Sequence, residues 1–257
     1  SNSLKLKYCM RGKKMLYEFC KKNSIWHRQC GKIIVSQKQQ SNKILELYKN
    51  GVKNGIENIS LLSSPEINHL ENKIKGRFGI FIKDTGIVDS HQFMNKLYQE
   101  SYESDHDYLF KTKFISSRKI NSGYDITIKN YSSNLETLTS DFIINCGGLQ
   151  SDVIGNLSKK SPSISFFKGC YFKLSSKWKN CFNHLVYPLP EKKLESLGIH
   201  LTIDKNGMAR LGPNSFKIDK NREEYHVDEA LKRKFFNADK TYIKGLSIDD
   251  IHPDYAG

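Results

Sequence analysis

The stretch from Ser140 to Asp152 constrains the fold most strongly, because a fully apolar run there is followed by two adjacent glycines. A short continuous apolar run such as Phe142-Ile143-Ile144 is typical of a strand buried on both faces in the central sheet of an α/β protein. Gly147 and Gly148 carry no Cβ atoms where a ligand would need close approach, and such sheets bind nucleotides in the crevice beyond the strand ends. A buried strand followed by an ordinary tight turn would give the same pattern, so both interpretations stay open.

Length and cysteine content narrow the class of protein. With 257 residues the chain can bury a substantial core, and we expect two lobes. No apolar run approaches the roughly 18 residues that span a bilayer. The six cysteines are scattered without C-x-x-C spacing. This argues against a zinc site or a disulfide scaffold and favours a reducing compartment.

The formal net charge of +14 raises the alternative of a nucleic-acid-binding protein. Only seven of the 41 basic residues are Arg, however, and specific phosphate and base recognition favours the bidentate guanidinium group. The lysines are also spread along the whole chain. We therefore interpret them as solvated surface charges and expect no nucleic-acid partner, with a weak attraction to anionic membrane surfaces left open.

Six further motifs accompany the glycine pair. In chain order they are Cys30-Gly31-Lys32-Ile33-Ile34-Val35, Asp84-Thr85-Gly86-Ile87-Val88-Asp89, Lys168-Gly169-Cys170-Tyr171-Phe172, Val186-Tyr187-Pro188-Leu189-Pro190, Leu197-Gly198-Ile199-His200-Leu201-Thr202 and Pro253-Asp254-Tyr255-Ala256-Gly257. With these motifs the chain resembles, over essentially its whole length, the FAD-dependent 2-hydroxy-acid oxidoreductases typified by L-2-hydroxyglutarate dehydrogenase/oxidase. These belong to the wider D-amino-acid-oxidase-like flavoenzymes.

The resemblance implies an α/β fold. An incomplete, Rossmann-like FAD-binding lobe is expected to interleave with a substrate domain (α+β) built mainly of antiparallel strands. We place residues 1–20 in a helix at the lobe junction, 21–85 and 161–212 in the substrate domain, and 86–160 in the FAD lobe. Residues 213–257 are expected to form a helical and loop segment that is truncated.

Apolar periodicity and capping residues predict secondary structure that fits this alternation. Helices are expected at 4–20, 41–51, from 64, at 89–101 and at 227–236, with Gly51 closing the second helix and Asp89-Ser90 capping the fourth. Strands are expected at 29–36, 78–83, 108–116, 124–129, 138–146, 163–174, 185–187, 198–204 and 208–211.

The glycine fingerprint G-x-G-x-x-G occurs nowhere in the chain. That motif places the FAD pyrophosphate at a helix N-terminus, where backbone N–H groups and the helix dipole meet its negative charge. In relatives it lies upstream of the position that corresponds to Ser1, and an Ile-Arg-Pro segment, whose Arg is expected to bind the substrate carboxylate, follows Gly257. We therefore expect an internal fragment of a flavoenzyme that is inactive by itself.

The resemblance assigns FAD contacts to four residues. Gly147 and Gly148 match a glycine turn that lies against the adenosine and pyrophosphate part of the cofactor. Phe114 matches a strand position whose backbone meets the adenine. Cys146 stands where relatives have small residues, and we treat it as packing beside the cofactor.

His200 is the candidate catalytic base. Oxidation of a 2-hydroxy acid needs a group that takes the hydroxyl proton while the α-hydrogen passes to the flavin, and a neutral imidazole suits that role near pH 7. Two-residue alternation places Gly198, His200 and Thr202 on one face of a strand, and the corresponding G-x-H-x-T segment of relatives faces the flavin. The alternative is a histidine that only orients a neighbouring strand.

Four residues are candidates for substrate binding. Tyr171 and Tyr187 could hydrogen-bond a carboxylate or hydroxyl group, Thr202 shares the face of His200, and Lys168 could offer positive charge to a dicarboxylic substrate. Packed phenols and a solvated lysine would account for the same residues. The acidic cluster of Glu103, Asp105, His106 and Asp107 has no second ligand pair at a sensible spacing, so we expect a solvated turn and no metal.

The resemblance implies an FAD-dependent oxidoreductase that acts on the CH–OH group of a small 2-hydroxy acid. The expected substrate is L-2-hydroxyglutarate, and the expected electron acceptor is a quinone or oxygen. Two alternatives stay open. One is a glycine or D-amino-acid oxidase of the same superfamily, and the other is a basic, non-catalytic binding module. The expected location is the cytoplasm, with peripheral association at the inner membrane, mitochondrial in a eukaryote, as a further option.

Because the chain lacks the pyrophosphate-binding fingerprint, we predict that the 257-residue polypeptide purified alone binds FAD weakly. Flavin absorbance after removal of free FAD is expected to show far less than one FAD per chain. A yellow preparation with stoichiometric FAD would contradict this expectation.

Overall fold

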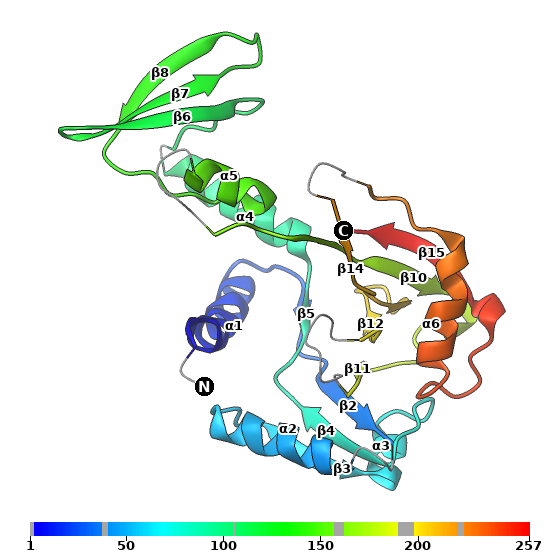
Figure 1. The fold of residues 1–257 in the computed structure, drawn as a ribbon. Coiled ribbons are helices and arrows are strands. Elements are labelled where there is room, and N and C mark those ends of the chain that lie inside the picture. The colour runs from blue at the N-terminus through cyan, green and yellow to red at the C-terminus, as the bar shows by residue number, and fades with distance from the viewer. Residues whose placement is uncertain (1–2, 38–40, 105, 157–161, 190–197, 220–223) are drawn as a thin grey trace. The chain divides into compact units, whose positions relative to one another are not determined.

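The computed structural model describes residues 3–37, 41–104, 106–156, 162–189, 198–219 and 224–257. The chain divides into two compact units. The first consists of Ser1–Leu97, Phe167–Phe216 and Glu223–Gly257, and the second of Tyr98–Phe166 and Lys217–Arg222. Both helices and sheets are present, which confirms the predicted α/β class (Figure 1).

The first unit is built on an eight-stranded sheet. Its strands are β2 (Lys32–Ser36), β3 (Ile59–Ser63), β4 (Phe78–Ile82), β10 (Cys170–Leu174), β11 (Leu185–Pro188), β12 (Leu201–Ile203), β13 (Ala209–Leu211) and β15 (Ile251–Ala256). They lie in the order β15-β10-β13-β12-β11-β2-β4-β3. Only β11 and β2 pair in parallel among these strands. The predicted, mainly antiparallel sheet is therefore confirmed.

Alternation along the strands gives this sheet one face whose centre is apolar. Ile33, Phe172, Leu201 and Leu211 are each completely buried and belong to one core cluster. Phe235 from α6 (Lys232–Asp239) completes this cluster, with its ring centroid 4.5 Å from that of Phe172. The inward residues thus pack beneath α6, while their sequence neighbours project from the opposite face.

The helix α2 (Ser41–Lys53) covers one end of that opposite face, where Ile44 packs with Ile34 and Ile80. The prediction that Gly51 ends this helix is wrong. The helix continues to Lys53, and Gly51 is buried inside it, where a Cβ atom would stand 2.7 Å from Ile59 Cδ1. Close packing therefore explains this glycine.

Three further predicted helices are present: α1 (Leu4–Lys22), α3 (Ser64–Leu70) and α4 (Ser90–Glu103), whose last residues lie in the second unit. The helix predicted at 227–236 is instead a 3-10 turn, η4 (Glu229–Leu231), followed by α6 (Lys232–Asp239). Asp89 caps α4, because its Oδ1 accepts a hydrogen bond from Gln92 N at 3.0 Å. Two short strand pairs belong neither to the eight-stranded sheet nor to the three-stranded sheet described below. They are β1 (His27–Arg28) with β5 (Ile87–Val88), and β9 (Phe166–Lys168) with β14 (Phe216–Ile218). The strand predicted over 163–174 is thus two strands, β9 and β10, separated by Gly169.

The second unit contains an antiparallel sheet of β6 (Lys113–Ile120), β7 (Gly123–Lys129) and β8 (Leu135–Ser140). The prediction of a buried strand through Phe142-Ile143-Ile144 to Cys146 is wrong. The strand ends at Ser140, and the Phe142 and Ile144 side chains are 82% and 86% exposed. Within the described residues no other strand pairs with this segment, so its backbone has no ladder to join.

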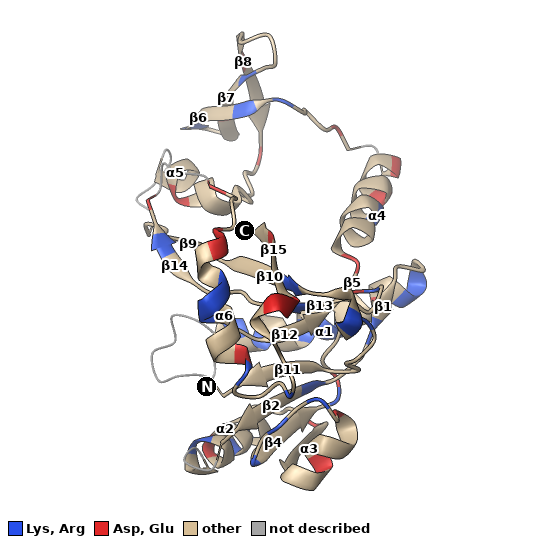
Figure 2. Cartoon of the chain, turned by 90° about the vertical axis from the view of Figure 1, so that its right-hand side faces the viewer, with Lys and Arg blue, Asp and Glu red and all other residues tan. Residues whose placement is uncertain are grey.

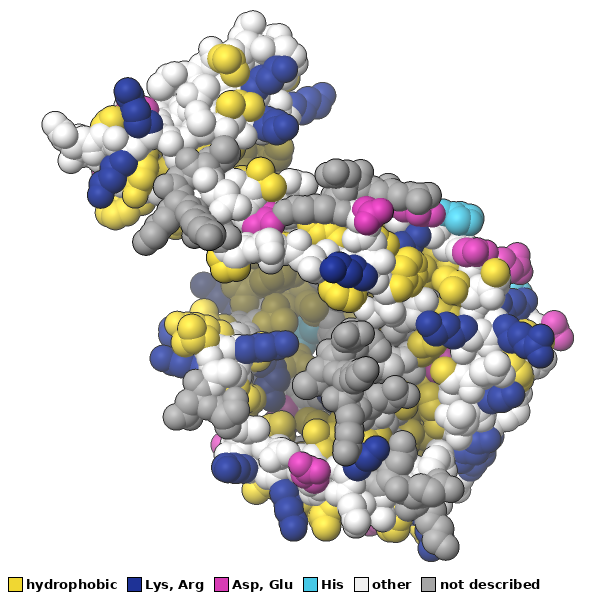
Figure 3. Space-filling model, viewed as in Figure 1, with side chains coloured by type: hydrophobic (Ala, Val, Ile, Leu, Met, Phe, Trp, Pro, Cys, Tyr) yellow, Lys and Arg dark blue, Asp and Glu magenta, His cyan; other side chains and the backbone are white. Residues whose placement is uncertain are grey.

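Charged side chains lie on many different elements. Lys and Arg occur on helices, strands and loops throughout the chain, with Asp and Glu between them (Figures 2 and 3). Among the described helices, none combines the length and the apolar composition that a membrane-spanning segment requires. The described residues contain no group of three or more His, Cys, Asp or Glu side chains placed to hold a metal ion. Asp105 of the acidic cluster lies outside the described residues.

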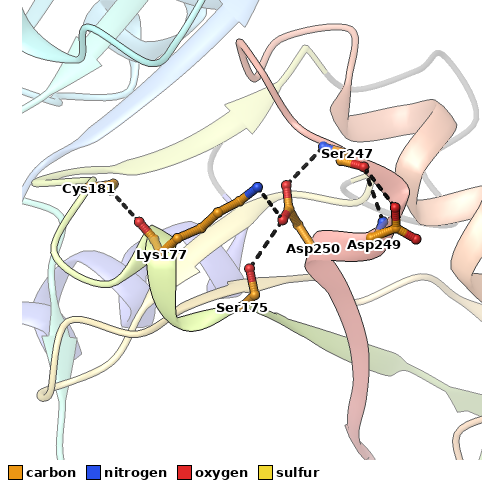
Figure 4. Close-up of polar contacts among 6 residues, drawn as sticks. All are labelled: Ser175, Lys177, Cys181, Ser247, Asp249 and Asp250. Atoms are coloured by element: carbon orange, nitrogen blue, oxygen red, sulfur yellow. Dashed lines mark hydrogen bonds and ion pairs between the residues drawn. The ribbon is translucent and has the colours of Figure 1, made fainter.

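A buried carboxylate fixes the start of β15. Asp250 ends the 3-10 turn η5 (Ile248–Asp250) and accepts hydrogen bonds from Ser247 N at 2.9 Å and Ser175 Oγ at 3.2 Å (Figure 4). Lys177 Nζ forms an ion pair with it at 2.7 Å. Burial alone would raise the pKa of Asp250, but these donors hold it below its ordinary value. The contacts tie the residues around η5 to the loop that follows β10.

We predict that Asp250→Asn lowers the free energy of unfolding by about 2 kcal/mol, because charge-assisted hydrogen bonds of a buried group are lost. The neighbouring exposed residue provides the control, and Asp249→Asn is expected to change stability by less than about 0.5 kcal/mol. Urea unfolding followed by circular dichroism would measure both. Equal effects of the two substitutions would contradict the role of Asp250.

Candidate active site

The eight-stranded sheet of the first unit has a second face, opposite the main core. The central part of this second face carries the residues predicted to act on a substrate. Tyr171 alternates with the buried Phe172 on β10, and His200 and Thr202 flank the buried Leu201 on β12. All three therefore project away from the main core. The Tyr187 ring, from β11, is stacked on the His200 ring with centroids 3.9 Å apart. The sheet thus brings four of the predicted residues to one face.

A cavity of about 520 Å³ lies at this face, entirely within the first unit. It is lined by Phe167, Lys168, Gly169, Tyr171, His200, Pro213, Asn214, Ser215, Tyr255 and Gly257. Three predicted residues, Lys168, Tyr171 and His200, share this lining. Its volume is within the range of small-molecule sites.

The His200 ring is held in a single orientation. Its Nδ1 lies 3.1 Å from Gly198 O, and because a carbonyl oxygen only accepts, Nδ1 carries the hydrogen. The His200 carbonyl in turn accepts from Gly212 N at 2.9 Å. The neutral ring therefore has its free lone pair on Nε2, which is the nitrogen able to take a proton.

Burial keeps this imidazole neutral. His200 is 5% exposed, and desolvation lowers its pKa from 6.5 to about 4. The hydrogen bond to Gly198 works against this shift, and the positive charge of Lys32 adds to it. The ring is consequently unprotonated at neutral pH.

The two tyrosines are protonated donors in this environment. Burial raises the pKa of both Tyr171 and Tyr187 above the ordinary phenol value. Tyr171 also stacks on Tyr255, with ring centroids 4.5 Å apart and planes 17° from parallel. Stacking of this kind restricts the orientation of the rings, and their hydroxyl groups remain able to hydrogen-bond a polar ligand.

Lys168 lines the cavity, but its ammonium group has partners within the protein. Its side chain is only 6% exposed, donates to His226 O at 2.5 Å and lies 3.9 Å from a Glu224 carboxylate oxygen. Whether it also binds a substrate stays a prediction. Thr202 shares the sheet face with His200 but does not belong to the cavity lining.

Sequence inspection missed three residues of this face: Lys32, Arg210 and Tyr255. The Lys32 ammonium lies 4.8 Å from the centroid of the Tyr187 ring. Arg210 is held by Asp204 at 2.7 Å and Asp254 at 2.6 Å. Lys32 and Tyr255 both belong to the ordered motifs. Lys32 is a charged residue at the start of an otherwise buried strand, and this pattern could have identified it from the sequence.

The predicted cofactor-contacting residues lie in the second unit. Gly147 and Gly148 form the turn into a 3-10 helix, η2 (Gly148–Gln150), and then α5 (Ser151–Asn156). The turn is fixed by Asn145, whose Oδ1 accepts from Gly147 N at 3.1 Å. Gly148 has φ +53°, and nothing lies within 4 Å of where its Cβ would stand. This open backbone fits close approach by a ligand.

The remaining two cofactor candidates are less constrained. Cys146 is exposed beside the glycine turn. Phe114 is half-buried on β6, opposite Ile128, next to an irregularity in the strand pairing. Their contacts with FAD stay predictions.

Comparison with known proteins places this chain in a family. Residues 1–257 match the family described as FAD dependent oxidoreductase. The L-2-hydroxyglutarate dehydrogenase, mitochondrial, of Mus musculus is 34% identical over 256 residues, which cover 91% of this chain and 54% of that protein. The Arabidopsis thaliana protein of the same name is 27% identical, over 100% of this chain and 61% of that protein.

Solved structures agree on the fold. FAD-bound L-alpha-glycerophosphate oxidase from Mycoplasma pneumoniae matches with a TM-score of 0.85 at 20% identity, over 100% of this chain and 68% of that chain. Glycine oxidase from Geobacillus kaustophilus matches with a TM-score of 0.79 at 13% identity and the same coverage. At such identities the likeness concerns the fold alone.

This chain therefore belongs to the FAD-dependent oxidoreductases, which confirms the family that the ordered motifs predicted. FAD is the cofactor of that family. The chain spans about half the length of the curated relatives it matches.

We predict that His200 titrates near pH 4 in the folded protein, as measured by NMR of the imidazole. Because this pKa lies below the unfolded value of 6.5, the unfolded state binds the proton first as the pH falls. The stability that the neutral ring contributes is thus complete above about pH 6.5 and is lost progressively toward pH 4. The signal that disappears in His200→Gln identifies the residue, and a pKa at or above 6.5 would contradict the burial argument.

Proposed function

We propose that this chain supplies the substrate-binding face and the catalytic base of an enzyme that oxidises the CH–OH group of a small 2-hydroxy acid. The candidate substrate is L-2-hydroxyglutarate, which is supported by the names of the curated relatives. The observation that carries the proposal is the neutral, oriented imidazole of His200 at the wall of the cavity.

His200 Nε2 takes the proton of the substrate hydroxyl group in this proposal. Burial ensures that the ring is unprotonated when the substrate arrives. The Nδ1–H bond to Gly198 then stabilises the imidazolium that forms, because it favours the protonated ring. The opposing effect of desolvation makes the ring release the proton again after the reaction.

The hydroxyl groups of Tyr171 and Tyr187 are proposed to orient the substrate through hydrogen bonds to its oxygens. Both remain protonated because burial raises their pKa values. Thr202 and Lys168 are proposed to contribute polar contacts from the same face and from the cavity wall. Phe167 and Pro213 add apolar surface to the cavity lining.

FAD, when bound, supplies the electron-accepting flavin. We propose that Gly147 and Gly148 lie against its adenosine and pyrophosphate part, with the Phe114 backbone near the adenine and Cys146 as packing. The open backbone of Gly148 supports this assignment. On this proposal residues 86–160 serve the cofactor, and residues 21–85 and 161–212 serve the substrate.

The electron acceptor and cellular location belong to the same proposal. A quinone or oxygen is the proposed acceptor. The eukaryotic relatives have "mitochondrial" in their names, which supports a mitochondrial location if the source is a eukaryote. The net charge of +14 supports peripheral attraction to an anionic membrane surface.

We predict that His200→Gln lowers kcat on L-2-hydroxyglutarate by about 10²- to 10⁴-fold in the FAD-loaded full-length protein, because general base catalysis is lost. His91→Gln, at an exposed position of α4, is the matched control and should retain the rate. Flavin content and melting temperature are measured alongside to confirm that both variants fold. Full activity of His200→Gln, or faster turnover of glycine or D-alanine than of 2-hydroxy acids, would contradict the proposal.

A further inference from the structure

Lys32 occupies a distinctive place beside the proposed base. It is the first residue of β2, and alternation along that strand puts its side chain on the face opposite Ile33 and the main core. Its ammonium group lies 4.8 Å from the centroid of the Tyr187 ring. That ring is itself stacked on His200. A lysine, a phenol and the imidazole therefore form one contiguous group.

The charge of Lys32 is not neutralised by the described residues. Two other cations of this region are: Arg210 has ion pairs with Asp204 and Asp254, and Lys168 lies beside Glu224. For Lys32, by contrast, no carboxylate within ion-pair distance occurs among the described residues. Its side chain is half-buried, and burial lowers its pKa from the ordinary lysine value.

Such an ammonium group favours an anionic ligand. Desolvation of an unpaired charge is unfavourable, and the Tyr187 ring compensates for it only in part. A ligand carboxylate would form a charge-assisted hydrogen bond to the amine and restore the charge balance. The group thus combines a base for a hydroxyl group with a cation for a carboxylate.

We propose that Lys32 binds the distal carboxylate of a dicarboxylic 2-hydroxy acid and thereby determines substrate specificity. This inference rests on the proposed function, because it places the reacting hydroxyl group at His200 Nε2. The carboxylate attached to the reacting carbon is adjacent to the reaction centre, whereas the distal one lies further along the chain. Lys32 Nζ and the His200 ring lie 4.8 Å and 3.9 Å from the centroid of the same Tyr187 ring, which keeps both within reach of the two ends of one small dicarboxylic acid.

The test compares substrates with and without the second carboxylate in the FAD-loaded full-length protein. Lys32→Met removes the charge but keeps the unbranched side chain. The ratio of kcat/KM for L-2-hydroxyglutarate to that for L-lactate should fall by about 10- to 100-fold, as expected for loss of one charge-assisted hydrogen bond. Lys32→Arg, which keeps the charge, should preserve most of this preference.

Binding of glutarate, followed by its perturbation of the flavin spectrum, gives a readout that does not depend on turnover. Its dissociation constant should rise by at least about tenfold in Lys32→Met. Lys83→Met is the matched control, because Lys83 is exposed and follows Ile82, the partner of Lys32 in β4. This control should bind glutarate as the unsubstituted protein does.

The outcomes separate this inference from the proposed function. Unchanged glutarate affinity and an unchanged substrate ratio in Lys32→Met would overturn the role of Lys32. An equal loss on both substrates would overturn the assignment to the distal carboxylate. If the protein oxidises no 2-hydroxy acid but still binds glutarate through Lys32, the proposed function fails while the anion site stands. If Lys32→Met does not fold, the same measurements are made on Lys32→Gln.

Discussion

The two-residue alternation of the eight-stranded sheet is the constraint on which the first unit depends. Inward side chains such as Phe172, Leu201 and Leu211 are completely buried and exclude water from one face. Their neighbours are therefore obliged to project from the other face, whatever chemistry they carry. A shift of one residue in β12 would turn His200 into the main core and Leu201 toward the cavity, so packing and site position cannot vary independently.

Burial of the sheet face opposite the main core then sets the protonation states and charges of the site. The same low-dielectric surroundings lower the pKa of His200, raise those of the tyrosines and leave the charge of Lys32 poorly solvated. A neutral base, neutral hydroxyl donors and a cation that favours an anion are consequences of one environment. Such a combination matches what the oxidation of a hydroxy acid requires of the protein itself.

Local sequence patterns predicted much of the fold because helix periodicity, caps and strand alternation are local properties. The helices at 4–20 and 64 onward and the cap at Asp89 were found in this way. Features that depend on distant partners were not. The apolar run at 142–144 has the composition of a buried strand, yet strand formation requires a neighbouring ladder.

The same distinction holds for the site. Residues within the ordered motifs, including Tyr171 and His200, were identified, and the structure brings them to one cavity. Lys32 was overlooked because its meaning depends on Tyr187 and His200, which lie more than 150 positions further along the chain. Lys168 was a candidate for offering its charge to a dicarboxylic substrate, but its partners at 224 and 226 become visible only in three dimensions.

An experimental structure of the full-length protein with L-2-hydroxyglutarate bound, and with FAD reduced so that no turnover occurs, would test the central claim most directly. We expect the substrate hydroxyl group to donate a hydrogen bond to His200 Nε2, on the sheet face that carries Tyr171 and Tyr187. A ligand bound on another surface, or a His200 ring turned so that Nε2 faces the protein interior, would contradict the claim.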